Sequence, residues 1–222
     1  MTTKRPLARR PRVTRAKGTP RGPRQWLQLV YQIPSEPSRH RVFIWRRVKA
    51  LGALYLRDGV CIAPDRPVVR EALQTLLNEL RAFGSWGDLF ELSLDPPQRG
   101  AYVEALNARR DEEYGEVLED AARLAARIER HLLQRDYAFQ EVEELDEELQ
   151  KLRRWRDKVA RRDFFQCARA GEGEGALRRC AAELERFERA VVKEGEDRQA
   201  GRVAAAAPRR AGRASLSRLQ AP

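Results

Sequence analysis

Hydrophobic and polar residues alternate with a period of two in the first predicted element and follow a helical period in the second. Residues 26–33 place apolar side chains on every second position, which predicts a strand. Residues 39–51 have a broad apolar side, which predicts a helix that ends at Gly52. Asp58-Gly59 between two short apolar runs is typical of a hairpin turn. The predicted elements are strand 26–33, helix 39–51, strands 53–57 and 60–63, helix 68–83 and strand 88–94.

The order β-α-β-β-α-β predicts a ferredoxin-like domain, in which four antiparallel strands carry both helices on one face. Trp45 lies at the centre of the apolar side of helix 39–51, so we expect it in the core rather than against a nucleic-acid base. The sheet face opposite the helices is expected to be solvated, to pair with a second copy, or to be lightly covered by later helices. Its predicted half-polar residues are Gln28, Gln32, Glu91 and Ser93.

After Asp95 the pattern is helical throughout. Residues 98–134 and 139–165 show heptad-like apolar positions, and the short link between them predicts an antiparallel hairpin related to a coiled coil. The GEGEG segment is predicted to be a linker before a third helix from Gly175 to about Glu194. The protein is therefore predicted to be α+β. Its predicted parts are a basic tail at 1–24, the ferredoxin-like domain at 25–95, a helical extension at 96–200 and a basic tail at 201–222.

The net charge of +11 in this chain of 222 residues comes from its two ends. Residues 1–24 hold nine Lys or Arg and residues 201–222 hold five, neither with an acid, whereas the rest holds 30 basic and 33 acidic residues. Both ends have few large apolar residues, so we expect them to be disordered. No apolar run approaches the roughly 18 residues of a membrane span. Without a secretory signal pattern at 1–24, we expect a cytoplasmic protein with no membrane partner.

Positive charge on helix 39–51 is the clearest functional signal. Cations held on a helix whose apolar side is docked cannot all be hidden from solvent, and such fixed donors suit the phosphates of DNA. The alternative is that these cations only solvate the outer face of a packed helix. Residues 1–24 are a second candidate, either as an arm that follows a groove or as a solubilising extension. The predicted DNA-binding residues are Arg39, Arg41, Arg46, Arg47 and Lys49 in the helix and Arg9, Arg10 and Arg12 in the tail.

Three sequence blocks have a distinctive spacing. They are PSxxRxxxWRRxKxxGA at 37–53, Asp-Gly-Val at 58–60 and WxxxxxRRDF at 155–164. With the segments around them, these blocks resemble the N-terminal domain of ChrB, the chromate-resistance regulatory protein, over roughly residues 25–192. A more distant similarity links the sequence to the central domain of PaaX-type repressors.

The resemblance implies a transcriptional regulator of a chromate-efflux operon, with this domain in contact with DNA. Proteins of this family continue into a C-terminal domain associated with chromate sensing. Here the sequence after residue 200 is basic instead, so we do not expect this polypeptide to sense chromate directly. The PaaX domain shares its RNase-like fold with small CRISPR-associated endonucleases, which hold a metal through an acid near the end of the first strand. This sequence has Tyr31-Gln32-Ile33 there, and a neutral amide does not supply the charge that Mg²⁺ prefers.

No catalytic or cofactor chemistry is indicated elsewhere. Cys61, Cys167 and Cys180 are far apart, and His40 and His131 are the two histidines, so neither a disulfide framework nor a zinc site is expected. We interpret Cys61 and His131 as packing residues. The GEGEG segment is acidic and does not suit phosphate. We predict no enzymatic activity, no metal and no cofactor.

The predicted function is a non-catalytic, DNA-binding regulator of chromate resistance that dimerises through sheet or hairpin surfaces. The alternative is a protein-interaction module whose helical hairpin docks a separate chromate-sensing partner. The weakest alternative is a divergent metal-dependent nuclease.

Overall fold

The computed structural model describes residues 25–34, 36 and 38–206, and these divide into two compact units. The first unit contains residues up to 114 together with 158–170, and the second contains 115–157 with the residues from 171 onward. The predicted binding residues Arg9, Arg10 and Arg12 lie outside the described residues. The elements are β1 Gln25–Gln32, α1 Ser38–Ala50, β2 Leu54–Arg57, β3 Val60–Pro64, α2 Pro67–Ala82, β4 Trp86–Ser93, α3 Pro96–Gln134, α4 Phe139–Arg161 and α5 Ala170–Ala206.

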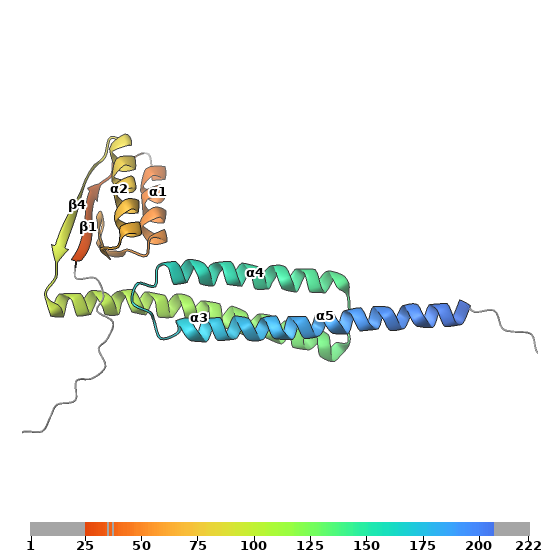
Figure 1. Cartoon of the computed structure of the whole chain (residues 1–222). Helices are drawn as coiled ribbons and strands as arrows, with labels where there is room; N and C mark the ends of the chain where they lie inside the picture. The colour runs from red at the N-terminus through yellow and green to blue at the C-terminus, as the bar shows by residue number, and fades with distance from the viewer. Residues whose placement is uncertain (1–24, 35, 37, 207–222) are drawn as a thin grey trace, which may run out of the picture. The chain divides into compact units, whose positions relative to one another are not determined.

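The first unit is built on a four-stranded antiparallel sheet with the strand order β2-β3-β1-β4. Helices α1 and α2 lie side by side on one face of this sheet (Figure 1). The predicted α+β class and the β-α-β-β-α-β order are confirmed. This topology places the end of β1 next to the turn between β2 and β3, where a cavity with a partly polar lining forms.

Local sequence signals explain where these elements begin and end. Gly59 has a φ of +73°, and its carbonyl accepts a hydrogen bond of 2.7 Å from the backbone N–H of Tyr31, so the hairpin turn is tied to the central strand. Pro67 is at the start of α2, where its missing N–H and fixed φ are tolerated. Gly84, with a φ of +68°, follows the end of α2. The predicted hairpin and helix limits are confirmed.

The core of the first unit lies between the sheet and the two helices. Apolar residues of the central strands face those of α2 at i, i+3, i+4 and i+7 spacing, as an amphipathic helix requires. Helix α1 contributes a narrower contact, from two residues one turn apart. The fully buried members include Leu27, Leu29 and Cys61 of the sheet, Ile44 and Val48 of α1, and Leu73, Leu76 and Leu80 of α2.

The sequence assigned part of β4 to the wrong face of the sheet. Glu91 and Ser93 were predicted to face away from the helices, but Glu91 is opposite Leu27 in the register and forms an ion pair with Arg70 of α2. Phe90 consequently lies on the opposite face, where it is half-exposed. The prediction failed because it placed the alternating series Phe90, Leu92 and Leu94 against the helices, whereas Leu89 and Glu91 occupy that face.

Part of the opposite sheet face is covered by later elements of the same unit. Trp26 is fully buried there, with its ring stacked on Phe165 at 5.9 Å and tilted against Tyr102 at 6.0 Å. Leu106 of α3 and Phe164 are also buried in this core. Of the three expectations for this face, light coverage by later segments is the one observed at Trp26.

The second unit is a bundle of three helical segments: α3 from residue 115, most of α4, and α5 (Figure 1). The predicted hairpin link is confirmed, since α3 ends at Gln134 and α4 begins at Phe139. His131 is a packing residue, with its ring 5.7 Å from that of Phe187. The buried residues of the bundle include Val117, Leu124, Ile128, Leu145, Leu149, Leu184 and Phe187.

Three predicted limits in the helical part were wrong. The GEGEG segment is not a linker, because residues 171–175 lie within the first turns of α5. Helix α4 ends at Arg161 and not at residue 165, so Phe164 and Phe165 lie beyond it, in the core of the first unit. At its other end α5 reaches Ala206, so it includes residues 201–206 of the segment predicted to be disordered. None of the described helices is both long and apolar enough to cross a membrane.

Substitution of Gly52 tests whether residues 158–170 pack closely against the end of α1. A Cβ at Gly52 would collide with the Cβ of Arg162, and its φ of +74° is already unfavourable for other residues. Gly84 has a similar φ of +68° but open space around it. Gly84→Ala should therefore show only backbone strain, about 1–2 kcal/mol, whereas Gly52→Ala should lose a further ~1–3 kcal/mol from overpacking. Urea unfolding of both variants measures the difference, and equal losses would contradict this packing.

Candidate nucleic-acid interface and the adjacent cavity

Helix α1 presents an unbalanced set of positive charges. It contains no acidic residue, and all five predicted DNA-binding residues of the helix are exposed. In the described part of the chain, four of them form no ion pair with a carboxylate. These four are Arg39, Arg41, Arg46 and Lys49. Their charges are therefore available to an external anion.

Arg47 differs from the other four cations. Its guanidinium forms an ion pair of 2.6 Å with Glu79 of α2, and it lies 5.6 Å from the centre of the Phe43 ring. The side chain is thus engaged between the two helices. Of the five residues predicted on α1, Arg47 is the one whose charge is already compensated.

Trp45 is not a core residue, which corrects the prediction from the sequence. Its side chain is 49% exposed, and Val42 and Phe43 are also exposed. Only Ile44 and Val48 of α1 are fully buried. Successive residues are about 100° apart around a helix, so Trp45 lies well to one side of the contact made by Ile44. An apolar side as broad as the predicted one cannot all reach a sheet that touches the helix along a single ridge.

Arg41, Trp45 and Lys49 are spaced by four residues and so share one side of α1. The ammonium of Lys49 lies 5.0 Å from the centre of the Trp45 ring, within the range of a cation–π contact. This side of the helix combines two cations with a large exposed aromatic ring. That combination is typical of surfaces that bind phosphate-bearing aromatic ligands.

The same side of α1 borders a cavity of about 650 Å³. The cavity is formed by the end of β1, by α1 and by the β2–β3 hairpin, and its lining includes Arg41, Trp45, Arg57 and Asp58. Arg57 was missed by the sequence analysis. Its position beside the Asp58-Gly59 turn was the available signal, but nothing local indicated that the turn lies next to α1.

Tyr31 and Tyr55 also line this cavity, and their hydroxyls are 3.0 Å apart. Burial is the largest influence on both phenols, and it raises the pKa of Tyr31 and of Tyr55 above the ordinary value. Both groups are therefore neutral at physiological pH. They add hydrogen-bonding capacity to the cavity without adding negative charge.

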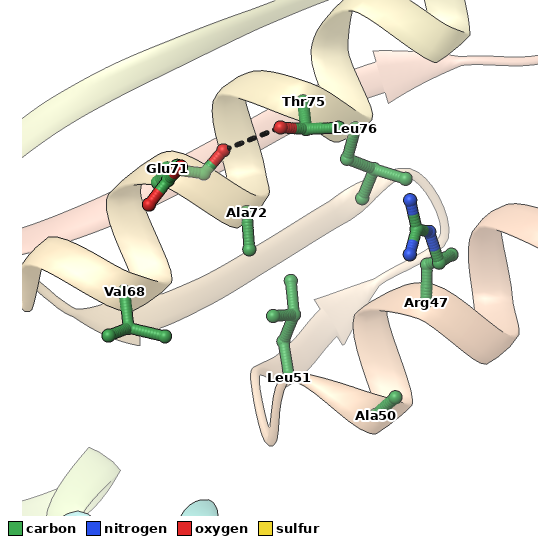
Figure 2. A pocket seen from close by; sticks show the side chains of 8 residues that line it. All are labelled: Arg47, Ala50, Leu51, Val68, Glu71, Ala72, Thr75 and Leu76. Carbon is green, nitrogen blue, oxygen red and sulfur yellow. Dashed lines mark hydrogen bonds between the residues drawn. The ribbon is translucent and has the colours of Figure 1, made fainter.

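A second cavity of about 370 Å³ lies between α1 and α2 (Figure 2). Leu51, Val68 and Leu76 give it an apolar character, and Arg47 lies at its edge (Figure 2). The Thr75 hydroxyl donates a hydrogen bond of 3.0 Å to the carbonyl of Glu71 in its own helix. This cavity therefore presents neither an unpaired cation nor a free hydroxyl for chemistry.

Comparison with known proteins identifies the family. The model of the family described as "Protein ChrB, N-terminal" matches residues 41–198. The chain belongs to the ChrB N-terminal family. It is also similar to Protein ChrB of Cupriavidus metallidurans, with 46% identity over 54 residues. That matched stretch covers 24% of this chain and 17% of the relative.

The RRDF block at residues 161–164 has an architectural role in the structure. Arg162 forms an ion pair of 3.2 Å with Glu113 and its guanidinium lies 3.5 Å from the carbonyl of Lys49, near the end of α1. Asp163 accepts a hydrogen bond of 3.0 Å from the backbone N–H of Cys167. The ring of Phe164 lies beneath the guanidinium of Arg66 at 5.4 Å. The block therefore fixes residues 158–170 against the end of α1.

The three cysteines are free and buried, and burial raises the pKa of each thiol. The pKa of Cys61 rises to about 12 through burial. That of Cys167 rises to about 11 through burial and through a hydrogen bond that its thiol donates to Asp111. In the described residues, no group of three or more His, Cys, Asp or Glu side chains could hold a metal ion.

These thiols should react slowly in the native protein. Because a raised pKa keeps a thiol protonated, the rate of Cys167 modification by an aromatic disulfide should still be rising between pH 8 and pH 10. Asp111→Asn removes one cause of the raised Cys167 pKa and should increase the rate of modification at pH 8. The part of the modification that is lost in Cys167→Ser is the part due to Cys167. A native rate that levels off below pH 9 would contradict the shift.

Proposed function

We propose that this member of the ChrB N-terminal family is a transcriptional regulator in chromate resistance that binds duplex DNA and catalyses no reaction. The proposal is carried by the four α1 cations that have no carboxylate partner in the described part of the chain. The phosphates of DNA carry the complementary negative charge. Because the backbone of α1 is already folded against the sheet, its cations can bind phosphates without ordering a further segment of the chain.

Arg39 and Arg46 are the α1 cations best placed for the DNA backbone. They are seven residues apart, which is two helical turns or about 10.5 Å along the axis. Both therefore lie on the outer side of the helix, away from buried Ile44. Arg9, Arg10 and Arg12 remain predicted contacts of an N-terminal arm. Phosphate contacts position the protein on DNA without reading the bases, so sequence recognition requires further residues.

The chemistry of the cavity supports a non-catalytic role. Asp58 is the one carboxylate among its lining residues, and it shares the cavity with Arg41 and Arg57. A Mg²⁺ ion needs several oxygen ligands and is repelled by nearby guanidinium groups. These residues therefore favour an anion over the metal that a nuclease would require.

We propose that the protein acts as a dimer. The second candidate function, an alternative to DNA binding, is a protein-interaction module that docks a separate chromate-sensing partner. At the α3–α4 turn, Leu133 is 77% and Phe139 is 67% exposed. Two large apolar side chains at the tip of a hairpin suit a protein contact. This feature supports the second candidate function, a module that docks a sensor.

Arg46→Ala tests the DNA-binding proposal. Removing one phosphate contact should weaken binding to a labelled duplex from the promoter of its own operon, by roughly three- to tenfold. The slope of log K against log salt concentration is negative, and its magnitude should fall by about 0.9. Fluorescence anisotropy at several salt concentrations measures both quantities.

Arg189→Ala is the matched control, because Arg189 is an exposed arginine of α5 that contacts Glu185 at 3.8 Å. It changes the net charge equally and should leave the affinity and the slope unchanged. Equal effects of the two variants would reject a specific role for α1. Cleavage of the duplex in the presence of Mg²⁺ would reject the non-catalytic part of the proposal.

A further inference from the structure

The cavity beside α1 has the size of a small-molecule site. Its volume is about 650 Å³, within the roughly 300–1,000 Å³ of ligand pockets in proteins. Three segments that are separate in the sequence form it: the end of β1, one side of α1 and the β2–β3 hairpin. The hydrogen bond from the N–H of Tyr31 to the carbonyl of Gly59 holds two of these segments together.

The charges in this cavity select for an anion. Arg41 and Arg57 approach it from different elements, and neither forms an ion pair with a carboxylate in the part of the chain that the structure describes. Asp58 offsets one of the two charges, so the lining remains positive. Guanidinium groups from two directions suit a phosphate, which accepts paired hydrogen bonds from each planar fork.

The aromatic residues indicate that the ligand also has a ring. Trp45 is half-exposed at the cavity, although a tryptophan side chain gains more than most from being covered. A simple inorganic anion would bind the arginines and leave the indole and most of the volume unused. A duplex on the outer side of α1 would keep its bases stacked and could not bring one to Trp45.

We propose that this cavity binds a nucleotide, with the base against Trp45 and the phosphate between Arg41 and Arg57. The ligand chemistry, a phosphate attached to an aromatic base, is shared by a free nucleotide and by an unpaired nucleotide in a single strand. Arg41 is also one of the cations proposed to contact a duplex, whereas Arg57 and Trp45 are not, so variants of Arg57 and Trp45 test this site separately from the DNA surface.

Calorimetric titration of the full chain tests this site. The probes are deoxyadenosine monophosphate, deoxyadenosine, inorganic phosphate and a short single-stranded oligonucleotide. Deoxyadenosine and phosphate should each bind at least roughly tenfold more weakly than the probe that joins base and phosphate. Arg57→Ala and Trp45→Ala should each weaken that probe about tenfold or more. Binding of the monophosphate identifies a free nucleotide as the source, and binding of the oligonucleotide alone identifies an unpaired strand.

Two matched variants control for charge and for loss of a tryptophan. Arg46→Ala removes an exposed α1 cation that does not line the cavity, and Trp86→Ala removes another exposed tryptophan. Both should bind the nucleotide probe normally, and thermal unfolding should show that all four variants are folded. The proposal is overturned if no probe binds, if phosphate binds as tightly as the nucleotide, or if Arg57→Ala and Trp45→Ala retain wild-type affinity. Duplex binding that is weakened in Arg46→Ala but unchanged in Arg57→Ala separates this site from the DNA surface.

Discussion

The narrow contact between α1 and the sheet determines how the first unit presents its charges. Among the residues of α1, Ile44 and Val48 alone are fully buried, and they form one ridge. Burying a charged group without a partner costs several kcal/mol of hydration free energy. The cations of α1 therefore stay outside the buried contact. Because the contact is narrow, most of the circumference of α1 lies outside it. The cations and the exposed Trp45 occupy this outer part of the helix.

A helix held by so narrow a ridge needs support at its end, and residues 158–170 supply it. Arg162 lies beside the carbonyl of Lys49, near the end of α1, and shares Glu113 with the buried Arg110. Burial lowers the pKa of Arg110, and the adjacent Glu113 opposes that shift. A cation at the C-terminus of a helix is also favourable for its dipole. The two arginine-rich blocks of the sequence thus have different physical roles, one fixing the helix and the other exposed on it.

The sequence was sufficient for the order of elements, because each strand and helix carries its own period and its own turn residues. It was insufficient for the faces of α1 and β4. The faces on which Trp45 and Glu91 lie depend on tertiary contacts, such as the ion pair between Glu91 and Arg70. The hydrophobic period of a segment does not predict these contacts. The cavity was missed for the same reason, since Arg57 and Trp45 belong to segments that only the folded sheet brings together. The roles of the basic residues on α1 and at 1–24 stay predictions.

The rigid helix α1 divides its side chains among three surroundings. Arg47 meets α2, Arg39 and Arg46 point to solvent, and Arg41 with Trp45 borders the cavity. Charges on the last two sides are separated by no more than the width of a helix, about 10–12 Å, which is comparable to the Debye length of about 8–10 Å. An anion in the cavity would therefore lower the positive potential that a duplex meets. Because coupling between two binding sites is reciprocal, a bound duplex would lower the affinity of the cavity for the anion by the same factor.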